Sequence, residues 1–390
     1  GTPVNSAAVK ASIERAKEMP GSTVTEVFSF VSGIEAPDDD TVIVELAEPR
    51  ADAASVFASY PASIINPAYM DRDLNQTAAG SGPYQLVSVS PNDRAAYEKH
   101  PDYWDEDVSA FNKLEILGIA DDNARLNAQR SGQVDASMVR LAELPEAQSL
   151  VEQGGTELSE IGRPTWWSMS LNNTQGPLSN PDVRRAMNYA IDRDAINKGL
   201  LNEGCEPTSQ PIQSGTEGHV DDPSVGYDYD VEKAQQLLSD AGYADGFRLN
   251  AVTGGSLTPV TPALQEQLAR VGIDLAVQAA DLNDALAQWV GGTADTFIFS
   301  HNTSTDPVIT LRDNFMTSRF QGELPDAVSS DLDQIMTQQR SRDERKALLE
   351  DVSRKISNEA LQVFICAPPT LYLHAETIGG FDTMNVPAHG

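Results

Sequence analysis

Residues 171–192 read LNNTQGPLSNPDVRRAMNYAID and combine an extended polar segment, a proline-containing loop and a helix. Asn180 is suited to cap that helix and Pro181 to begin it. Apolar residues recur at the three- and four-residue spacing of one buried helix face, whereas Arg184 and Asn188 lie off that face. The apolar face comprises Val183, Ala186, Met187, Ala190 and Ile191. We expect this strand, loop and helix to mark the crossing of the chain from one lobe to another.

The length and charge of the chain narrow the possible functions. Its 390 residues exceed what one hydrophobic core usually holds, so we expect two or three domains. The formal net charge of −31 repels nucleic acid and anionic membrane surfaces, so neither is an expected partner. This charge fits a secreted, highly soluble protein better than it fits one selected for a cationic ligand, because net charge acts first on solubility. No apolar run reaches the roughly 20 residues of a membrane helix.

The first third of the chain predicts helices, hairpins and one crossover. A helix follows Asn5, and residues 22–46 alternate as two strands around the turn PDDD. Two further strands follow the turn at residues 80–84. A strand at 113–119, a helix and a strand at 134–139 predict a parallel crossover, which is typical of an α/β lobe.

The rest of the chain predicts a second α/β lobe. Strands at 247–252, 273–279 and 294–300 alternate with amphipathic helices, the clearest at 230–241. Two helices follow at 325–338 and 343–359. The apolar strand 361–373 is broken by Pro368 and Pro369, and we interpret this break as the return crossing to the first lobe.

Motifs of enzymes and metal sites are missing from the sequence. It has no G-x-S-x-G, H-E-x-x-H or C-x-x-C pattern, and its five histidines are far apart. We therefore predict no catalytic residue, no metal and no cofactor. Cys205 and Cys366 leave two alternatives open, a disulfide in an exported protein or a buried free thiol at Cys366.

Candidate binding residues lie where predicted strands end, because ligands of open α/β sheets bind beyond the carboxyl ends of strands. Residues 301–307, HNTSTDP, follow the strand 294–300; the alternative interpretation is a capped turn before a helix. Trp166 and Trp167 lie on the strand that enters residues 171–192. Strand alternation sends one into the core and the other to the opposite face, where we expect it to stack on a ligand, unless both pack. Further candidates for a pocket wall are Glu206, Thr208, Ser209 and Gln210.

Five stretches resemble one protein family, and they occur in its order. They are FSFVSGIEAPDDDTVIVEL (28–46), GSGPYQL (80–86), HPDYWDED (100–107), IADDNARLNAQRSGQVDASMV (119–139) and LNNTQGPLSNPDVRRAMNYAID (171–192). Together they resemble the family 5 extracellular solute-binding proteins, the dipeptide, oligopeptide and nickel receptors of ABC importers. The start of the chain resembles a later part of that family's pattern, so we expect it to lack the family's N-terminal portion.

This resemblance implies an α/β, periplasmic-binding-protein-like fold with two lobes joined by a hinge and a smaller accessory domain. We expect residues 1–100 in a partial accessory domain, residues 101–170 and 368–390 in lobe I, and residues 171–367 in lobe II. The implied function is capture of a small solute, such as a peptide or sugar, and its delivery to an ABC permease. The implied protein is an extracellular or periplasmic monomer, anchored as a lipoprotein. The alternative is a ligand-sensing domain of a regulator or chemoreceptor.

The resemblance also implies which residues bind the solute. The family's pattern places Ser300 at a tryptophan, Ser304 at a tyrosine and Thr303 at the aspartate that holds a peptide's α-amino group. Because a buried ammonium without a carboxylate is costly, a neutral or differently charged solute is favoured. Asn172 matches an asparagine that holds the hinge backbone. The predicted ligand-binding residues are Trp166, Trp167, Asn172, Ser300, His301, Asn302, Thr303 and Asp306.

Overall fold

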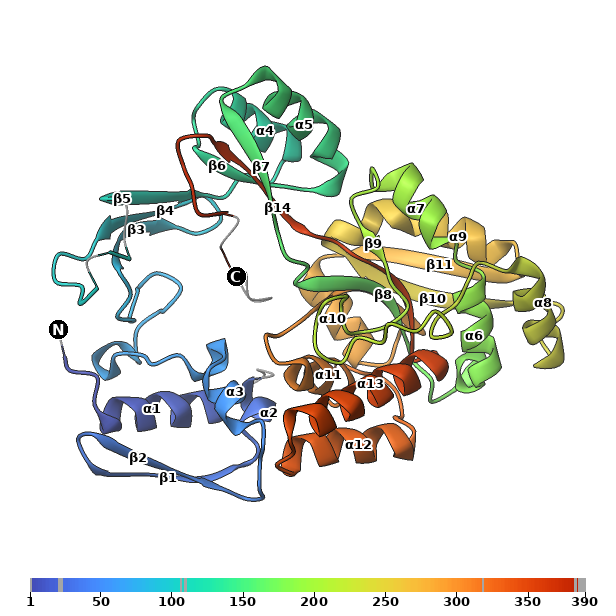
Figure 1. The fold of residues 1–390 in the computed structure, drawn as a ribbon, viewed down its shortest axis with the longest axis horizontal. Coiled ribbons are helices and arrows are strands. Elements are labelled where there is room, and N and C mark those ends of the chain that lie inside the picture. Colours follow the sequence, from blue (N-terminus) through green and yellow to red (C-terminus); the bar gives the residue numbers. More distant parts are fainter. Residues whose placement is uncertain are drawn as a thin grey trace. The chain divides into compact units, whose positions relative to one another are not determined.

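The computed structural model describes residues 2–19, 24–105, 107–108, 111–317, 319–381 and 384. The chain divides into two compact units, Gly1–Ala128 and Gln129–Gly390. Each unit combines helices with sheets (Figure 1). Among the described residues, no helix has the length and apolar character needed to cross a membrane.

The first unit contains a helix on a hairpin. Strands β1 (Val31–Asp38) and β2 (Thr41–Leu46) pair antiparallel, which confirms the predicted turn. Helix α1 (Ser6–Lys17) packs on them, and the Asn5 side chain accepts a hydrogen bond from the Ala8 amide at 3.1 Å. Residues 24–27 form helix α2 (Val24–Val27), so the prediction of a strand there is wrong. The short elements that follow are α3 (Ala53–Phe57), η1 (Tyr60–Ala62) and η2 (Pro67–Tyr69).

A three-stranded antiparallel sheet completes the first unit, and it corrects the predicted crossover. Its strands are β3 (Tyr84–Ser90), β4 (Arg94–Lys99) and β5 (Lys113–Leu117). Helix α4 (Asp122–Arg130) follows, but β6 (Ala136–Val139) joins a different sheet. The parallel crossover predicted between β5 and β6 is therefore wrong. Each strand found a partner elsewhere in the sequence, β4 for β5 and β14 for β6, which local periodicity does not report.

The described residues of the second unit form two sheets. In the smaller sheet, β14 (Thr370–Ala375) lies between β6 and β7 (Thr156–Ile161), and both pairings are antiparallel. Helix α5 (Leu144–Gln153) packs against β7 and is preceded by the turn η3 (Leu141–Glu143).

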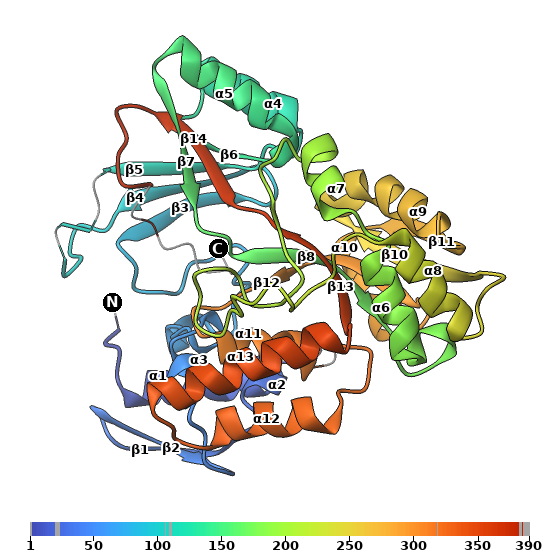
Figure 2. The same ribbon diagram turned by 45° about the vertical axis from the view of Figure 1, so that its right-hand side comes forward.

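The larger sheet has six strands in the order β11-β10-β12-β8-β13-β9 (Figure 1 and Figure 2). Strands β11 and β12 both run parallel to β10, which confirms the predicted β-α-β-α-β lobe. Strand β8 runs antiparallel to β12 and to β13. The strand bounds are β8 (Thr165–Leu171), β9 (Glu206–Pro207), β10 (Phe247–Gly254), β11 (Ile273–Ala280), β12 (Thr296–Asn302) and β13 (Gln362–Ala367).

Helices surround this sheet. They are α6 (Pro181–Tyr189), α7 (Arg193–Leu200), α8 (Val231–Asp240), α9 (Thr261–Ala269), α10 (Leu282–Val290), α11 (Pro307–Phe315), α12 (Asp326–Thr337) and α13 (Arg342–Asn358), with the turns η4 (Gly176–Ser179) and η5 (Gly255–Val260). Helices α12 and α13 lie side by side (Figure 1 and Figure 2). A core of Trp166, Leu311, Leu332, Val352 and Phe364 joins helices α11 to α13 to strands β8 and β13.

Helix α6 confirms one prediction made from residues 171–192 and corrects another. The Asn180 side chain accepts a hydrogen bond from the Asp182 amide at 2.9 Å, which confirms the predicted cap. Arg184 and Asn188 were placed off the buried face, yet they are only 4% and 0% exposed. Arg184 donates to the Glu359 carbonyl, and Asn188 donates to the Gln362 carbonyl. These polar groups are buried because they bind backbone carbonyls that are distant in sequence.

The chain passes between the two sheets of the second unit in two short segments. One is residues 162–164, between β7 and β8, where Gly162 has a φ of 53° that favours glycine. The other is residues 368–369, and the break predicted at these two prolines is confirmed by the separate sheets of β13 and β14. Strand β8 lies inside the six-stranded sheet, so the change of sheet precedes it instead of following residue 171. The division of the chain into the predicted lobes stays a prediction.

Candidate functional site

The sheet brings most of the predicted binding residues to one edge, by which we mean the edge formed by the ends of its strands and not an outer strand. Trp167 pairs with Ser300, and Trp166 pairs with His301 across β8 and β12. The carboxyl ends of β12 and β13 and the start of β8 meet there, because β8 is antiparallel to both. Asn172 lies at the other end of β8, about 20 Å away for six extended residues. Its side chain accepts hydrogen bonds from the amide and hydroxyl of Thr174.

His301 lies in β12 next to this edge, and its side chain is buried. It is 6% exposed and stacks on Trp166 with ring centroids 4.9 Å apart. Asn314 donates its amide hydrogens to carbonyls, so its Oδ1 accepts from His301 Nδ1–H at 3.0 Å. Nε2 then accepts from the Ser170 hydroxyl at 3.2 Å. Burial lowers the His301 pKa to about 4, against the opposing effect of the Asn314 hydrogen bond, and the imidazole is neutral.

The two tryptophans take opposite faces of β8, as alternation predicts, and both are buried. Trp166 is fully buried and donates its indole N–H to Gln362 Oε1 at 3.0 Å. Trp167 is 9% exposed and lies opposite Cys366 in the strand register. In this arrangement both rings pack against protein, which matches the alternative interpretation, and stacking on a solute stays a prediction.

The loop after β12 is tied to the first crossing segment. The Thr303 amide and hydroxyl both donate to the Pro164 carbonyl, at 2.7 and 3.0 Å. Asp306 caps α11 through the Val308 amide at 2.9 Å and forms an ion pair with Arg345. Thr303 therefore faces the crossing segment, whereas the Asp306 carboxylate is engaged in holding the helix start.

A small cavity of about 40 Å³ lies against this loop. Its lining consists of Arg163, Pro211, Ile212, Gln213, Thr216, Thr303, Ser304, Pro307 and Thr310. The lining has hydroxyls, one carboxamide and one guanidinium, but no carboxylate. Of the predicted residues only Thr303 lines it. Arg163, Gln213 and Thr216 were missed, because they lie in irregular segments without a spacing pattern.

A larger cavity of about 360 Å³ is also lined by residues of the loop after β9. The pocket-wall candidates Glu206, Thr208, Ser209 and Gln210 line it together with Tyr227 and Tyr229. Asp192, Asp194 and Asp228 also line it, together with Arg193, so carboxylates outnumber the guanidinium in its wall. Gln213 lines both cavities.

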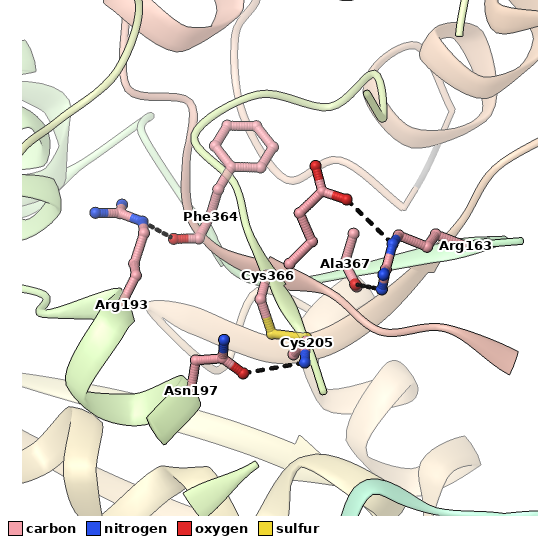
Figure 3. The surroundings of a disulfide bond; sticks show 8 residues. Arg163, Arg193, Asn197, Cys205, Phe364, Cys366 and Ala367 are labelled. Carbon is pink, nitrogen blue, oxygen red and sulfur yellow. Dashed lines mark hydrogen bonds and ion pairs between the residues drawn. A yellow bond between two sulfur atoms is a disulfide. The ribbon is translucent and has the colours of Figure 1, made fainter. Parts of the chain in front are cut away.

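A disulfide joins the residue before β9 to β13 (Figure 3). Cys205 and Cys366 are bonded, with Cα atoms 5.8 Å apart, which decides between the two alternatives left open by the sequence. Arg163 lies close by and donates to the Ala367 carbonyl at 3.1 Å. It also forms ion pairs with Glu160 at 2.8 Å and with Glu206 at 3.1 Å. Its positive charge is thus balanced by two carboxylates outside the small cavity. No group of three or more potential metal ligands occurs among the described residues.

Known proteins share this sequence and fold. Residues 1–323 match the family described as bacterial extracellular solute-binding proteins, family 5 Middle. The chain is 27% identical to the glutathione-binding protein GsiB of Pectobacterium atrosepticum, over 98% of this chain and 78% of that protein. It is also 27% identical to GsiB of Escherichia coli K12, over 75% of this chain and 57% of that protein. The alignment thus spans little more than half of the E. coli protein.

Solved structures show the same fold. DppA of Helicobacter pylori, in complex with the peptide STSA, has a TM-score of 0.87 and 22% identity over 99% of this chain and 80% of that chain. AgaA of A. tumefaciens R10, in complex with agropinic acid, has a TM-score of 0.85 and 25% identity over 98% and 80%. These similarities confirm the predicted α/β, periplasmic-binding-protein-like fold. The chain belongs to family 5 of the bacterial extracellular solute-binding proteins.

Proposed function

We propose that the solute is held at the edge where β8, β12 and β13 meet, in contact with the small cavity beside Thr303. As a family 5 protein, the chain captures a solute outside the cytoplasmic membrane and works with an ABC permease. The observation that carries the proposed site is the hydroxyl, carboxamide and guanidinium lining at the ends of these strands. A cavity of about 40 Å³ has room for only a few water molecules, so it receives one group of the solute and not the whole.

The lining favours a neutral polar group of a peptide-like or sugar-like solute. The cavity has no carboxylate to pair with an ammonium, and burying an unpaired ammonium is costly. The relatives and structural neighbours are named for glutathione, a peptide and agropinic acid, which share amide or hydroxyl groups beside their charges. We therefore propose recognition through hydrogen bonds, with the charged groups of the solute held elsewhere.

The predicted residues then divide by role. We propose direct contact for Thr303 and Ser304, which line the small cavity, and for Ser300 and Asn302 at the end of the strand; all four are half-buried. Trp166 and His301 support the edge from below, Trp167 supports its opposite face, and Asp306 holds the start of α11. Asn172 acts on the backbone after β8, at the far end of the strand.

Calorimetry on the purified protein with a solute panel tests the proposal. The panel contains glutathione, the peptide Ser-Thr-Ser-Ala, raffinose and a sugar-derived amino acid conjugate. Ser304→Ala removes one hydroxyl from the cavity and should weaken binding about 2- to 12-fold, the range for a hydrogen bond of about 0.5–1.5 kcal/mol. The matched control is Thr305→Ala, next in the chain and exposed, which should bind like the wild type. Absence of binding across the panel, or equal effects of the two variants, would contradict the proposed site.

Two further properties concern the oligomeric state and the attachment to the membrane. We propose a monomer that is held at the cell surface by a lipid anchor, as the family resemblance implies. Light scattering of the purified protein tests the first point. Mass spectrometry of the protein extracted from its native membrane tests the second, and a water-soluble species without lipid would contradict it.

A further inference from the structure

Gln213 is a deeply buried side chain that touches both cavities of the second unit. It lies in the loop between β9 and α8 and is 7% exposed. It lines both the small cavity and the larger one.

The carboxamide of Gln213 is almost without partners inside the protein. Its Nε2 lies 3.5 Å from the Pro211 carbonyl, at the outer limit of a hydrogen bond. Its Oε1 has no hydrogen-bond donor among the described residues. Most side chains this enclosed have protein or water partners for their polar atoms, so this carboxamide is open to a group that enters either cavity.

Gln210 provides an internal comparison, because it is the same residue type with the same burial three positions earlier. It is 6% exposed, donates to the Val220 carbonyl at 3.1 Å and accepts from the Val220 amide at 2.9 Å. Both polar atoms of the Gln210 carboxamide thus form hydrogen bonds within the protein, whereas the Gln213 carboxamide can bind another partner.

We propose that Gln213 recognises the solute, by pairing its carboxamide with a group that both donates and accepts a hydrogen bond. This inference rests on the proposed function and names the chemistry that the site selects. A carboxamide presents one acceptor and one donor side by side, which matches a peptide amide or neighbouring hydroxyls. A carboxylate would use only the donor, and an ammonium only the acceptor. Ser304 and Thr216 line the same cavity and add hydroxyls beside it.

The test compares Gln213→Leu with Gln210→Leu in the whole protein. Leucine is similar in size and removes only the polar end. Gln213→Leu should keep the urea midpoint of the wild type, since no internal hydrogen bond is lost, and should weaken binding of the panel's amide or hydroxyl solutes about 10-fold. Gln210→Leu should lower the urea midpoint, because it strands the Val220 amide and carbonyl. Gln213→Glu keeps the size and loses the donor, so it should also weaken binding.

Each outcome decides the assignment. If the wild type binds glutathione, the peptide or raffinose and Gln213→Leu binds it equally well, the assignment is overturned while the proposed function stands. If Gln213→Leu lowers the urea midpoint as much as Gln210→Leu, Gln213 is a structural residue and the assignment is overturned. If the wild type binds none of these probes, the proposed function fails and this inference fails with it.

Discussion

At the scale of single residues, His301 is a polar residue at the end of a strand that stabilises the fold through its hydrogen bonds and its ring stack. Its ring is held between the Ser170 hydroxyl and the Asn314 amide and stacks on Trp166. Both ring nitrogens have hydrogen-bond partners within the chain, so the side chain ties the end of β12 to β8 and α11. Burial keeps the imidazole neutral by lowering its pKa to about 4.

We expect this histidine to make stability fall in acid. Its folded pKa of about 4 lies below the ordinary 6.5, so the two states bind protons equally above pH 6.5. Between pH 6.5 and 4 the unfolded chain is protonated first, and the loss reaches about 3 kcal/mol at pH 4. His301→Gln should be less stable than wild type at pH 7 by about 1–3 kcal/mol, since it loses buried hydrogen bonds and the ring stack.

Urea unfolding at pH 7, 6, 5 and 4 measures this effect. The difference in the free energy of unfolding between wild type and His301→Gln should shrink as the pH falls from 6.5 to 4, because only the wild type has the histidine. A difference that stays constant over this range would show that His301 is protonated in the folded state as easily as in the unfolded one.

At the scale of elements, the short strand β9 depends on the disulfide. It has two residues, Glu206 and Pro207, and proline has no amide hydrogen to donate to β13. The bond between Cys205 and Cys366 fixes the strand directly, across a sequence separation of 161 residues. The same strand begins the loop that carries Gln213 to the two cavities.

Removing both cysteines should therefore loosen this loop and the whole protein. We expect the Cys205→Ala/Cys366→Ala double variant to lose about 2–5 kcal/mol of stability, because the unfolded chain regains the freedom of a long loop. Urea unfolding gives the loss, and hydrogen exchange of the Thr208 amide, which donates to the Ile365 carbonyl, gives its location. An unchanged exchange rate at Thr208 would mean that β9 is held by its hydrogen bonds alone.

At the scale of the whole second unit, Arg163 holds together the two segments that join the two sheets. It belongs to residues 162–164 and donates to the carbonyl of Ala367, which directly precedes Pro368. The Thr370 amide donates to the Gly162 carbonyl at 3.1 Å, which ties the same segments a second time. Arg163 also lines the small cavity, so a solute group bound there, as we propose, would touch the connection between the sheets. Family members of this fold class respond to a ligand by closing about such connections.

We expect Arg163→Gln to widen the range of positions that the two sheets adopt, with little change in stability. Partly exposed ion pairs such as those with Glu160 and Glu206 contribute about 0–1 kcal/mol. Spin labels on introduced cysteines at Glu152 in α5 and Asp343 in α13 report the distance between the sheets. The two native cysteines are bonded to each other and do not react with the label.

The control is Arg248→Gln, which breaks an exposed ion pair with Asp274 within β10 and β11. It should leave the distance distribution unchanged, because β11 and β10 lie at one side of the sheet and are not neighbours of β8 or β13, from which the connecting segments leave. A distribution as narrow in Arg163→Gln as in this control would show that the backbone alone sets the relation of the two sheets.

Part of the candidate site was predictable, and part was not. Strand alternation predicted the opposite faces of Trp166 and Trp167, and the sequence placed residues 301–307 where a strand ends. The pairing of β8 with β12, which brings Trp166, Ser300 and His301 together, is a finding of the structure. Gln213 and Arg163 were not predictable, because each gains its place from contacts with segments far away in the sequence. Asn172 shares a strand with Trp166, but the length of that strand separates them.

Most helices and strands of the second unit, the cap of α6 and the family could be predicted from the sequence, since they depend on side chains within a few residues of one another. Strand β9 was not predicted, and helix α11 was expected only in the alternative interpretation of residues 301–307. It took the three-dimensional structure to show that β5 and β6 join different sheets, that Arg184 and His301 are buried, and that Cys205 meets Cys366. Periodicity reports which side of an element is apolar. The partner of a strand or of a polar group is chosen by packing and hydrogen bonding between segments that can be more than a hundred residues apart.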